Sequence, residues 1–307
     1  MRRVASIDIG TNSTRLLVAD IDGHGRDAKL VTVDRRTQIT RLGQGVHEAR
    51  ALHPDAIERT LTTLRDYRQI IDERGAEQVR VTATSASRDA ANRDEFFDPA
   101  EHVLGVRPEL LSGEEEANLE YLGATAALNE PGPYLVFDVG GGSTEFIAGN
   151  DTPDALCSLD IGCVRLTEQF LHGDPPTPEE LSQAVTVVRD HLADVDRLVP
   201  GAATARTLVG TAGTVWTLAA VELGLDASES DRIDHFRLTR AAAEDVFRTL
   251  ATESIAQRRH NPGLEPGRVD VIVGGAIVVV SVMRHWAFDE LIVSEADILD
   301  GLARSLG

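Results

Sequence analysis

Cysteine, lysine and long apolar runs are scarce in this sequence of 307 residues. The two cysteines, Cys157 and Cys163, have a spacing that matches no zinc or disulfide-exchange motif, so we expect buried free thiols. The longest apolar stretch, residues 269–283, is interrupted by Asp270 and two glycines and is too short to cross a bilayer. The first residues run directly into a strand pattern and do not resemble a signal peptide. We therefore expect a soluble, cytoplasmic protein with no membrane partner.

Positive charge is also in short supply. The formal net charge is −20, and Lys29 is the only lysine, so almost every basic side chain is an arginine. A negative field of this size argues against non-specific binding to DNA or RNA, and we expect no nucleic-acid partner. A polyanionic substrate would need metal ions and a local group of arginines to overcome the same field.

Two stretches of this sequence are nearly the same. Residues 8–15 read Asp-Ile-Gly-Thr-Asn-Ser-Thr-Arg, and residues 138–145 read Asp-Val-Gly-Gly-Gly-Ser-Thr-Glu. After each turn the strand pattern resumes, whereas a dinucleotide-binding fold or a Walker P-loop would begin a helix there. Glycine lets the backbone approach a phosphate and direct N–H groups at it. One such turn is most often only a turn, but two at corresponding places predict a duplicated fold.

The expected elements show the same duplication. In the first half we expect strands at 4–9, 15–21, 30–42, 78–83 and 109–111, and helices at 55–73, 89–97 and 112–128. In the second half we expect strands at 135–139, 144–149, 155–161, 207–210 and 290–294, and helices at 178–198, 215–223 and 240–252. The valines of residues 269–283 favour a strand, but the length and position of this segment favour a buried helix.

Three strands, a helix, a strand and a helix, repeated, form the plan of the ribonuclease-H-like domains in actin, Hsp70 and the sugar kinases. We therefore expect an α/β protein with two ribonuclease-H-like (actin-like ATPase) domains, residues 1–123 and 124–307. Two related halves that each carry a glycine turn predict a phosphate-binding cleft between the domains.

The acids of the two turns are candidates for a metal site. Asp8, Asp138 and Glu145 stand at or beside glycine turns, where they would face one cleft if the halves are related by pseudo-symmetry. A few carboxylates, completed by water and substrate oxygens, are how Mg²⁺ is bound in many proteins. The alternative is that both aspartates cap turns and that Glu145 points outward from its strand.

A run of three glutamates provides the candidate base. Ser112 with Glu115 forms a capping box, which gives Glu115 a structural role. Glu116 shares a helical face with Leu119 and Gly123, and we expect this face to pack inward. A carboxylate that is held rigidly and partly desolvated suits a general base for water. Taken alone, the run also fits three acids on a solvated first turn.

Two further turns carry candidate phosphate ligands. Residues 84–92 form a strand-to-helix turn in which Arg88 stands at the helix start, where it could bind a phosphate with two hydrogen bonds or pair with a surface acid. Residues 210–214 form another glycine turn before a helix, whose N-terminus attracts anions. Close helix–strand packing would explain that turn equally well.

Taken in order, these motifs resemble those of the exopolyphosphatase/guanosine pentaphosphate phosphatase family. They are Asp-x-Gly-x-Asn-Ser at 8–13, Thr-Ser-Ala-x-Arg-x-Ala-x-Asn at 84–92, Ser-Gly-x-Glu-Glu-Ala at 112–117, Asp-x-Gly-Gly-Gly-Ser-Thr-Glu at 138–145 and Gly-x-x-Gly-Thr at 210–214. The resemblance extends over essentially the whole chain and includes residues 161–167 and 268–272. The sequence departs from the family pattern at the third glutamate of the run and at residues 294–297, where many relatives carry small residues and glycine.

The resemblance implies Mg²⁺-dependent release of terminal phosphate, with Mn²⁺ as an alternative metal, from inorganic polyphosphate or from pppGpp. It implies Glu116 as the catalytic base, Arg88 as a second catalytic residue that binds phosphate, Asp138 and Glu145 as metal ligands together with Asp8, and a homodimeric assembly. The expected phosphate-binding residues are the motif positions Gly10, Thr11, Asn12, Ser13, Arg15, Gly140, Gly141, Gly142, Ser143, Thr144, Gly210, Thr211, Gly213 and Arg268.

Two other classes of function remain as alternatives: an actin-like ATP-binding protein or sugar kinase with the same fold, and a catalytically silent sensor of phosphate metabolites. A kinase would need a pocket for its hydroxyl substrate, whereas a base at a helix start suits attack by water. The net charge of −20 also predicts that long polyphosphates are not held between cuts, so short chains should be good substrates.

Overall fold

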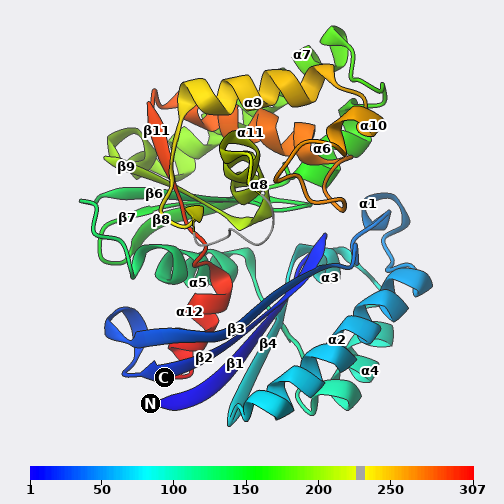
Figure 1. Ribbon diagram of the computed structural model, residues 1–307, viewed down its shortest axis with the longest axis vertical. Helices are drawn as coiled ribbons and strands as arrows, with labels where there is room; N and C mark the ends of the chain where they lie inside the picture. The colour runs from blue at the N-terminus through cyan, green and yellow to red at the C-terminus, as the bar shows by residue number, and fades with distance from the viewer. Residues whose placement is uncertain (226–231) are drawn as a thin grey trace. The chain divides into compact units, whose positions relative to one another are not determined.

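The computed structural model describes residues 1–225 and 232–307, and it divides into two compact units (Figure 1). Unit 1 consists of Met1–Ala127 and Ala296–Gly307, and unit 2 is Leu128–Glu295. The expected boundary near residue 123 lies close to the end of the first segment of unit 1. We expected the second domain to continue to residue 307. In the structure it ends at Glu295, and the last twelve residues belong to unit 1.

Unit 1 is built on a five-stranded sheet with the strand order β3-β2-β1-β4-β5. The strands are β1 (Arg2–Ile9), β2 (Ser13–Asp22), β3 (Lys29–Ile39), β4 (Gln78–Ala83) and β5 (Glu109–Leu110). The helical elements are η1 (Gly25–Asp27), α1 (Val46–Ala49), α2 (Pro54–Arg74), α3 (Ser85–Asp89), α4 (Asp94–Leu104), α5 (Gly113–Thr125) and α12 (Ile298–Ser305). Strands β1 to β3 are antiparallel, and β4 and β5 run parallel to β1.

Both faces of this sheet are covered along the central strand β1, where successive residues point to opposite sides. Ala5, Ile7 and Ile9 of β1 pack into one cluster with the apolar stripes of α2 and α4. Val4 lies on the other side, in a cluster with Leu299 and other residues of α12. The C-terminal helix therefore completes the core of unit 1, which explains why it belongs there (Figure 1).

Unit 2 repeats the plan with a six-stranded sheet in the order β10-β11-β9-β6-β7-β8. Its strands are β6 (Tyr134–Val139), β7 (Thr144–Gly149), β8 (Pro153–Leu159), β9 (Thr207–Thr211), β10 (Arg237–Thr239) and β11 (Glu290–Val293). Its helical elements are α6 (Cys163–Phe170), α7 (Pro178–Leu198), η2 (Pro200–Thr204), α8 (Ala212–Leu223), α9 (Arg240–Thr252), α10 (Ile255–Arg258) and α11 (Ile272–His285). Strands β8, β7, β6, β9 and β11 correspond to β3, β2, β1, β4 and β5, so the duplicated ribonuclease-H-like plan is confirmed.

Helix α11 settles the ambiguous segment in favour of a helix. Every residue from Ile272 to Met283 is buried in the core of unit 2, and this explains why the sequence shows no polar face there. None of the described helices is both long enough and apolar enough to cross a membrane.

The expected helix at residues 89–97 is wrong in its boundaries. The structure has α3 before it and α4 largely after it, with residues 90–93 outside either helix. The side chain of Asn92 explains the break: its Oδ1 accepts from the backbone N of Leu52 at 2.7 Å, and its Nδ2 donates to the Leu52 carbonyl at 3.1 Å. Helices α6 and α12 and strand β10 were not expected from the sequence.

Candidate functional site

The first glycine turn joins β1 to β2 and is held by backbone hydrogen bonds. Gly10 N donates to the Ser13 carbonyl at 2.9 Å, and the carbonyl of Asn12 accepts from Thr40 N at 3.0 Å and from Arg41 N at 2.8 Å. The Asn12 side chain is buried, and its Nδ2 has no hydrogen-bond partner among the described residues. A buried amide without an acceptor in the protein is uncommon and is available to donate to a ligand or to a water molecule.

The neighbouring Thr11 is fixed differently, through a 2.7 Å hydrogen bond between its hydroxyl and that of Ser85. This contact ties the first glycine turn to the start of α3, the helix that carries Arg88. The two motifs are therefore held side by side within unit 1.

Asp8 and Arg15 face each other at the base of the first glycine turn. They are register partners across β1 and β2, and Arg15 Nη2 lies 2.8 Å from Asp8 Oδ2. Burial raises the pKa of the Asp8 carboxyl, and the charge of Arg15 opposes that shift. The second carboxylate oxygen, Oδ1, is buried and has no partner among the described residues. An arginine partner for Asp8 was not anticipated from the sequence.

A second acid, Asp297, contacts the same arginine. Its Oδ2 accepts from Arg15 Nη1, and its Oδ1 accepts from the backbone N of Leu299 at 2.9 Å, which caps the start of α12. From the sequence alone, Asp297 stood out only as a departure from the family pattern. The Asp297-x-x-Asp300 spacing before an apolar run was a capping-box signal that could have revealed both the helix and the residue.

Glu116 and Arg88, the two expected catalytic residues, are brought together in unit 1. Arg88 Nη1 donates to Glu116 Oε2 at 2.7 Å and to the carbonyl of Leu111 at 2.9 Å. The Glu116 side chain is only 14% exposed. Burial raises its pKa, and Arg88 opposes this by stabilising the carboxylate. The pair is separated by 28 positions in the sequence, so only the fold could show the contact.

The neighbouring glutamate has the structural role expected of it. Glu115 accepts hydrogen bonds from the N and the hydroxyl of Ser112, at 2.9 and 2.8 Å, and completes the capping box of α5. These hydrogen bonds lower the pKa of Glu115. The expected inward face of α5 was only partly correct, because the buried side is formed by Ala117, Glu120 and their neighbours, and Glu116 lies at its edge. Glu120 was missed; it accepts from the backbone N of Ile298 at 2.8 Å and so anchors α12.

The second glycine turn joins β6 to β7 in unit 2. Asp138 and Glu145 are register partners across these strands, so two carboxylates occupy the places that an acid and an arginine occupy in unit 1. Glu145 is 3% exposed, and its Oε1 accepts from the hydroxyl of Ser158 at 2.7 Å. Directly opposed residues have Cβ atoms about 4.5–5.5 Å apart. Two carboxylates so placed suit a shared cation.

Helix α6 fixes the conformation of this turn. The N–H groups of Cys163 and Val164 donate to the carbonyls of Gly140 and Gly141, at 2.9 and 3.0 Å, and Arg165 Nε donates to the Gly142 carbonyl at 2.8 Å. The amides of Gly141 and Gly142 themselves make no hydrogen bond to the described residues. Holding the carbonyls in this way leaves backbone donors for an anion.

Two of the hydroxyl residues around the turn are engaged in packing. Thr144 is fully buried and donates to the carbonyl of Ile161. Thr211 is also fully buried and donates to the carbonyl of Phe137 at 3.3 Å. Ser143, at the turn itself, is also buried, with 5% of its surface exposed. Gly210 has its Cβ position blocked by the side chain of Val215, which favours a packing role for that glycine.

Arg268 is held against the other glycine of the 210–214 motif. A Cβ on Gly213 would overlap the guanidinium of Arg268, so a larger residue there would displace this side chain from its place. Arg268 is 8% exposed and donates through Nε to Glu265 at 2.9 Å. The adjacent Ala212 has a φ of 61°, a left-handed conformation that is costly for a residue with a Cβ. Strain of this kind at the start of α8 is typical of a functional turn.

The candidate metal ligands do not form a protein-only metal cage. Among the described residues, no group of three or more histidine, cysteine, aspartate and glutamate side chains converges on one point. The opposed carboxylates of Asp138 and Glu145 nevertheless fit Mg²⁺, which keeps water and substrate oxygens in its shell and needs only one or two protein acids. Mn²⁺ accepts the same carboxylate and water ligands.

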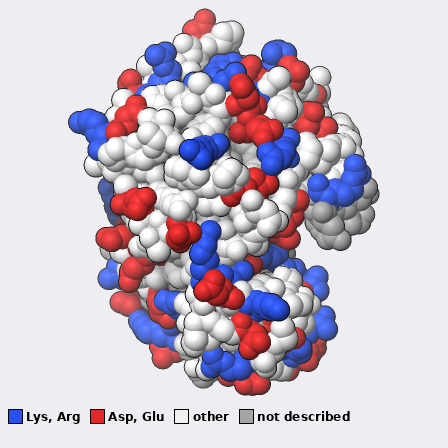
Figure 2. All heavy atoms as spheres, turned by 90° about the vertical axis from the view of Figure 1, so that its left-hand side faces the viewer, with Lys and Arg blue, Asp and Glu red and all other residues white. Residues whose placement is uncertain are grey.

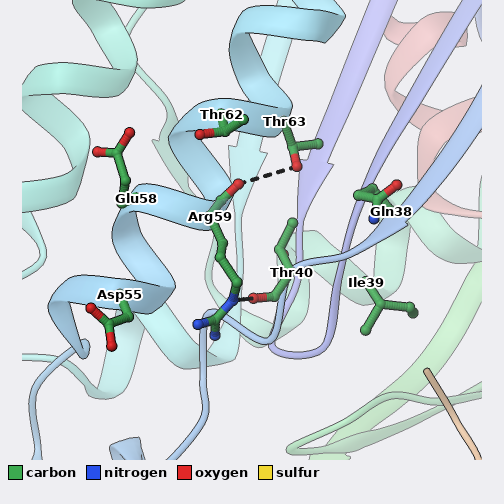
Figure 3. Close-up of a pocket in the computed structure, with 8 residues that line it drawn as sticks. All are labelled: Gln38, Ile39, Thr40, Asp55, Glu58, Arg59, Thr62 and Thr63. Carbon is green, nitrogen blue, oxygen red and sulfur yellow. Dashed lines mark hydrogen bonds between the residues drawn. The ribbon is translucent and has the colours of Figure 1, made fainter.

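A hollow of about 410 Å³ in unit 1 has no motif residue in its lining (Figure 3). It is lined by Gln38, Ile39, Thr40, Asp55, Glu58, Arg59, Thr62 and Thr63. In Figure 3 the Arg59 side chain extends from α2 to the end of β3, where Nε donates to the carbonyl of Thr40 at 3.1 Å. None of its lining residues was expected to act on phosphate.

The face drawn in Figure 2 shows no continuous basic surface that would bind a long polyanion. Acidic and basic side chains are interspersed on it. The arginines near the candidate phosphate ligands have acidic neighbours. Arg88 contacts Glu116, Arg165 lies 3.4 Å from Asp160, and Arg268 contacts Glu265. The basic groups are therefore local and largely neutralised.

Comparisons with known proteins agree with these motifs. A sequence model described as the Ppx/GppA phosphatase family matches residues 17–306. The curated relative "Exopolyphosphatase 2" of Mycobacterium tuberculosis is 45% identical over 316 residues, covering 100% of this chain and 99% of the relative. A solved structure described as an exopolyphosphatase-like protein matches with a TM-score of 0.91 and 38% identity, over 99% of this chain and 98% of that one. The Ppx/GppA family member of Aquifex aeolicus matches with a TM-score of 0.83 and 34% identity, over 99% and 97% of the two chains.

Proposed function

This chain belongs to the Ppx/GppA phosphatase family and is a hydrolase, and on that premise we propose that it is an exopolyphosphatase that releases terminal orthophosphate from inorganic polyphosphate. The relative from Mycobacterium tuberculosis, 45% identical along its full length, carries that name. The observation in the structure that supports the proposal best is the contact between Arg88 and Glu116 at 2.7 Å. It joins a largely buried carboxylate, suited to accept a proton, to a cation suited to hold a phosphate oxygen.

The proposed reaction is attack of water on the terminal phosphorus. Glu116 accepts a proton from the water molecule. As the water oxygen forms a bond to phosphorus, the bond from phosphorus to the bridging oxygen breaks. The products are orthophosphate and a chain shorter by one phosphate. The proton then passes from Glu116 to solvent, which restores the base. Arg88 orients Glu116 and neutralises charge on the phosphate that is transferred.

The remaining groups bind and orient phosphate. We assign the amides of Gly141 and Gly142, the side chain of Asn12 and the guanidinium of Arg268 to phosphate oxygens, since these are donors at the two glycine turns and at the start of α8. Mg²⁺ would be held by Asp138 and Glu145, and when bound it would supply positive charge to the phosphate oxygens. In unit 1, the Oδ1 atom of Asp8 lacks a partner among the described residues and is a candidate oxygen ligand for a cation.

The guanosine pentaphosphate pppGpp is the alternative substrate, because its terminal phosphoanhydride requires the same chemistry. The test is to measure orthophosphate release from tripolyphosphate, long polyphosphate, pppGpp and ATP in parallel, with Mg²⁺, with Mn²⁺ and with chelator. We expect polyphosphate to be the best substrate and chelator to stop its hydrolysis. A higher kcat/KM for pppGpp would replace the proposed substrate, and transfer of phosphate to an added sugar instead of water would exclude a hydrolase mechanism.

A further inference from the structure

A row of five charged side chains with alternating sign runs through unit 1. In order these are Asp8, Arg15, Asp297, Arg35 and Asp300, which come from β1, β2, the start of α12, β3 and α12. Arg35 Nη2 lies 2.5 Å from Asp300 Oδ2, and Arg35 Nη1 lies 3.9 Å from Asp297 Oδ1. All five side chains are at most 16% exposed. The row connects the C-terminal helix to the base of the first glycine turn.

Asp297 is the member of this row with two separate tasks. One oxygen, Oδ1, caps α12 by accepting from Leu299 N, while the other, Oδ2, accepts from Arg15 Nη1. Arg15 is thereby held on one edge by Asp297 and on another by Asp8, which accepts from Nε at 3.3 Å and from Nη2 at 2.8 Å. A planar guanidinium fixed by two carboxylates has its orientation determined before any ligand binds.

We propose that Arg15 binds a phosphate oxygen, as its place in the motif predicts, and that Asp297 is a positioning residue for Arg15. It acts by holding the guanidinium from the start of α12, and this proposal rests on the proposed function of the site. Arg15 stands directly beyond the first glycine turn, two residues after Ser13, and its side chain keeps 13% of its surface exposed. A long, flexible arginine side chain loses less entropy on binding an anion when its orientation is already fixed.

The row of charges also has a structural explanation, namely that it only anchors α12 to the sheet. The two explanations predict different effects of the substitution Asp297→Asn. Asparagine is as good a helix N-cap as aspartate, so the cap of α12 is retained. The substitution removes the negative charge beside Arg15 and replaces an acceptor oxygen with an N–H donor on one side. The anchoring of α12 should therefore survive in large part, whereas the hold on Arg15 should not.

The matched control is Asp300→Asn. Asp300 belongs to the same capping box, where its Oδ2 accepts from Asp297 N at 3.1 Å, and it pairs with Arg35 instead of Arg15. For tripolyphosphate hydrolysis we expect Asp297→Asn to lower kcat/KM about tenfold, mainly through KM. We expect Asp300→Asn to leave kcat/KM within about twofold of wild type while lowering the thermal midpoint. Equal loss of kcat/KM in both variants would show that anchoring of α12 is what matters, and would overturn the proposal.

Because Asp297 is proposed to act through Arg15, the decisive experiment is a double-mutant cycle. In an Arg15→Ala background, adding Asp297→Asn should change kcat/KM by less than about twofold, since there is no guanidinium left to position. A full tenfold further loss in that background would overturn the proposal. If Asp297→Asn does not fold, Asp297→Ser takes its place in the cycle, because serine also caps a helix but carries no charge.

Measuring the binding of tripolyphosphate tests the role of Asp297 independently of whether the protein hydrolyses it. Binding is measured by calorimetry in a Glu116→Gln background, alone and combined with Asp297→Asn or with Asp300→Asn. If the wild type releases no orthophosphate, the proposed function fails, and the binding comparison alone judges Asp297. Weaker binding with Asp297→Asn, beside unchanged binding with Asp300→Asn, supports the positioning role. Equal binding in the presence and absence of Asp297→Asn overturns it.

Discussion

Asp8 stands directly opposite Arg15 across β1 and β2, and the two side chains form an ion pair at 2.8 Å. The same register across β6 and β7 places Glu145 opposite Asp138. The duplicated fold has therefore kept the first acid of each turn and changed the sign of its partner. In unit 1 the acid is paired with an arginine. In unit 2 two carboxylates face each other, and this arrangement suits a cation.

The opposed carboxylates of Asp138 and Glu145 predict that the effect of Asp138→Asn on stability depends on whether Mg²⁺ is present. Like charges directly opposed on neighbouring strands are destabilising, by roughly 0.2–1 kcal/mol. In the presence of chelator, Asp138→Asn should therefore be at least as stable as wild type. It should also lose the rise in thermal midpoint that Mg²⁺ gives the wild type, and it should lose nearly all activity. A normal Mg²⁺ titration of stability in this variant would remove Asp138 from the metal site.

The assignment of the base predicts unequal effects of two adjacent substitutions. Glu116→Gln should reduce kcat by about 10²–10⁴-fold, because a positioned proton acceptor is lost. Glu115→Gln should stay close to wild type, since glutamine also serves in a capping box. Thermal unfolding of both variants provides the control for folding. A greater loss of turnover with Glu115→Gln would mean that the catalytic carboxylate was wrongly identified.

The environment of Glu116 predicts the pH dependence. Burial raises the pKa of its carboxyl. Because the base must be ionised to accept a proton, kcat/KM should rise with pH, and the midpoint of this rise should lie above the pKa of an ordinary glutamate. Arg88 favours the ionised form and lowers this pKa. Arg88→Met removes the cation, so the acid limb of the profile should move to higher pH, while Arg88→Lys keeps a positive charge and should move it less. A shift to lower pH with Arg88→Met would contradict this account.

The packing of Arg268 on Gly213 predicts a non-additive pair. Gly213→Ala places a methyl group where the guanidinium of Arg268 lies, so it should displace that side chain and lower kcat/KM about 10²-fold. In an Arg268→Ala background the same methyl group has room, and Gly213→Ala should cost little more. Steady-state kinetics of the four proteins provide the test. An additive loss would indicate that Gly213 matters for some reason other than Arg268.

The charge of the protein predicts how long chains are digested. With a net charge of −20 and local arginines that already contact acids, the enzyme should release a long polyphosphate between cuts. A gel time course should show ladders that shorten steadily. Persistence of full-length polymer beside free phosphate, with no intermediates, would show processive digestion instead.

Most of the helices and strands could be predicted from the sequence, and the motifs could be read from it directly. Periodic apolar residues located α2, α7 and α9 nearly to the residue, and the two glycine turns identified the duplication, because turn chemistry and alternation are local properties. The capping box of Ser112 and Glu115 was also local, and it separated Glu115 from Glu116 before any contact was known.

Which charged groups meet was settled by the packing of the chain alone. Asp297 lies 282 positions after Arg15, and Arg88 lies 28 positions before Glu116, so no local pattern could pair them. The last twelve residues joined unit 1 because α12 covers an apolar sheet face that the strand pattern alone left without a partner. Ion pairs of this kind depend on distance and burial, and both are set by how the chain packs and not by which residues stand near one another in sequence.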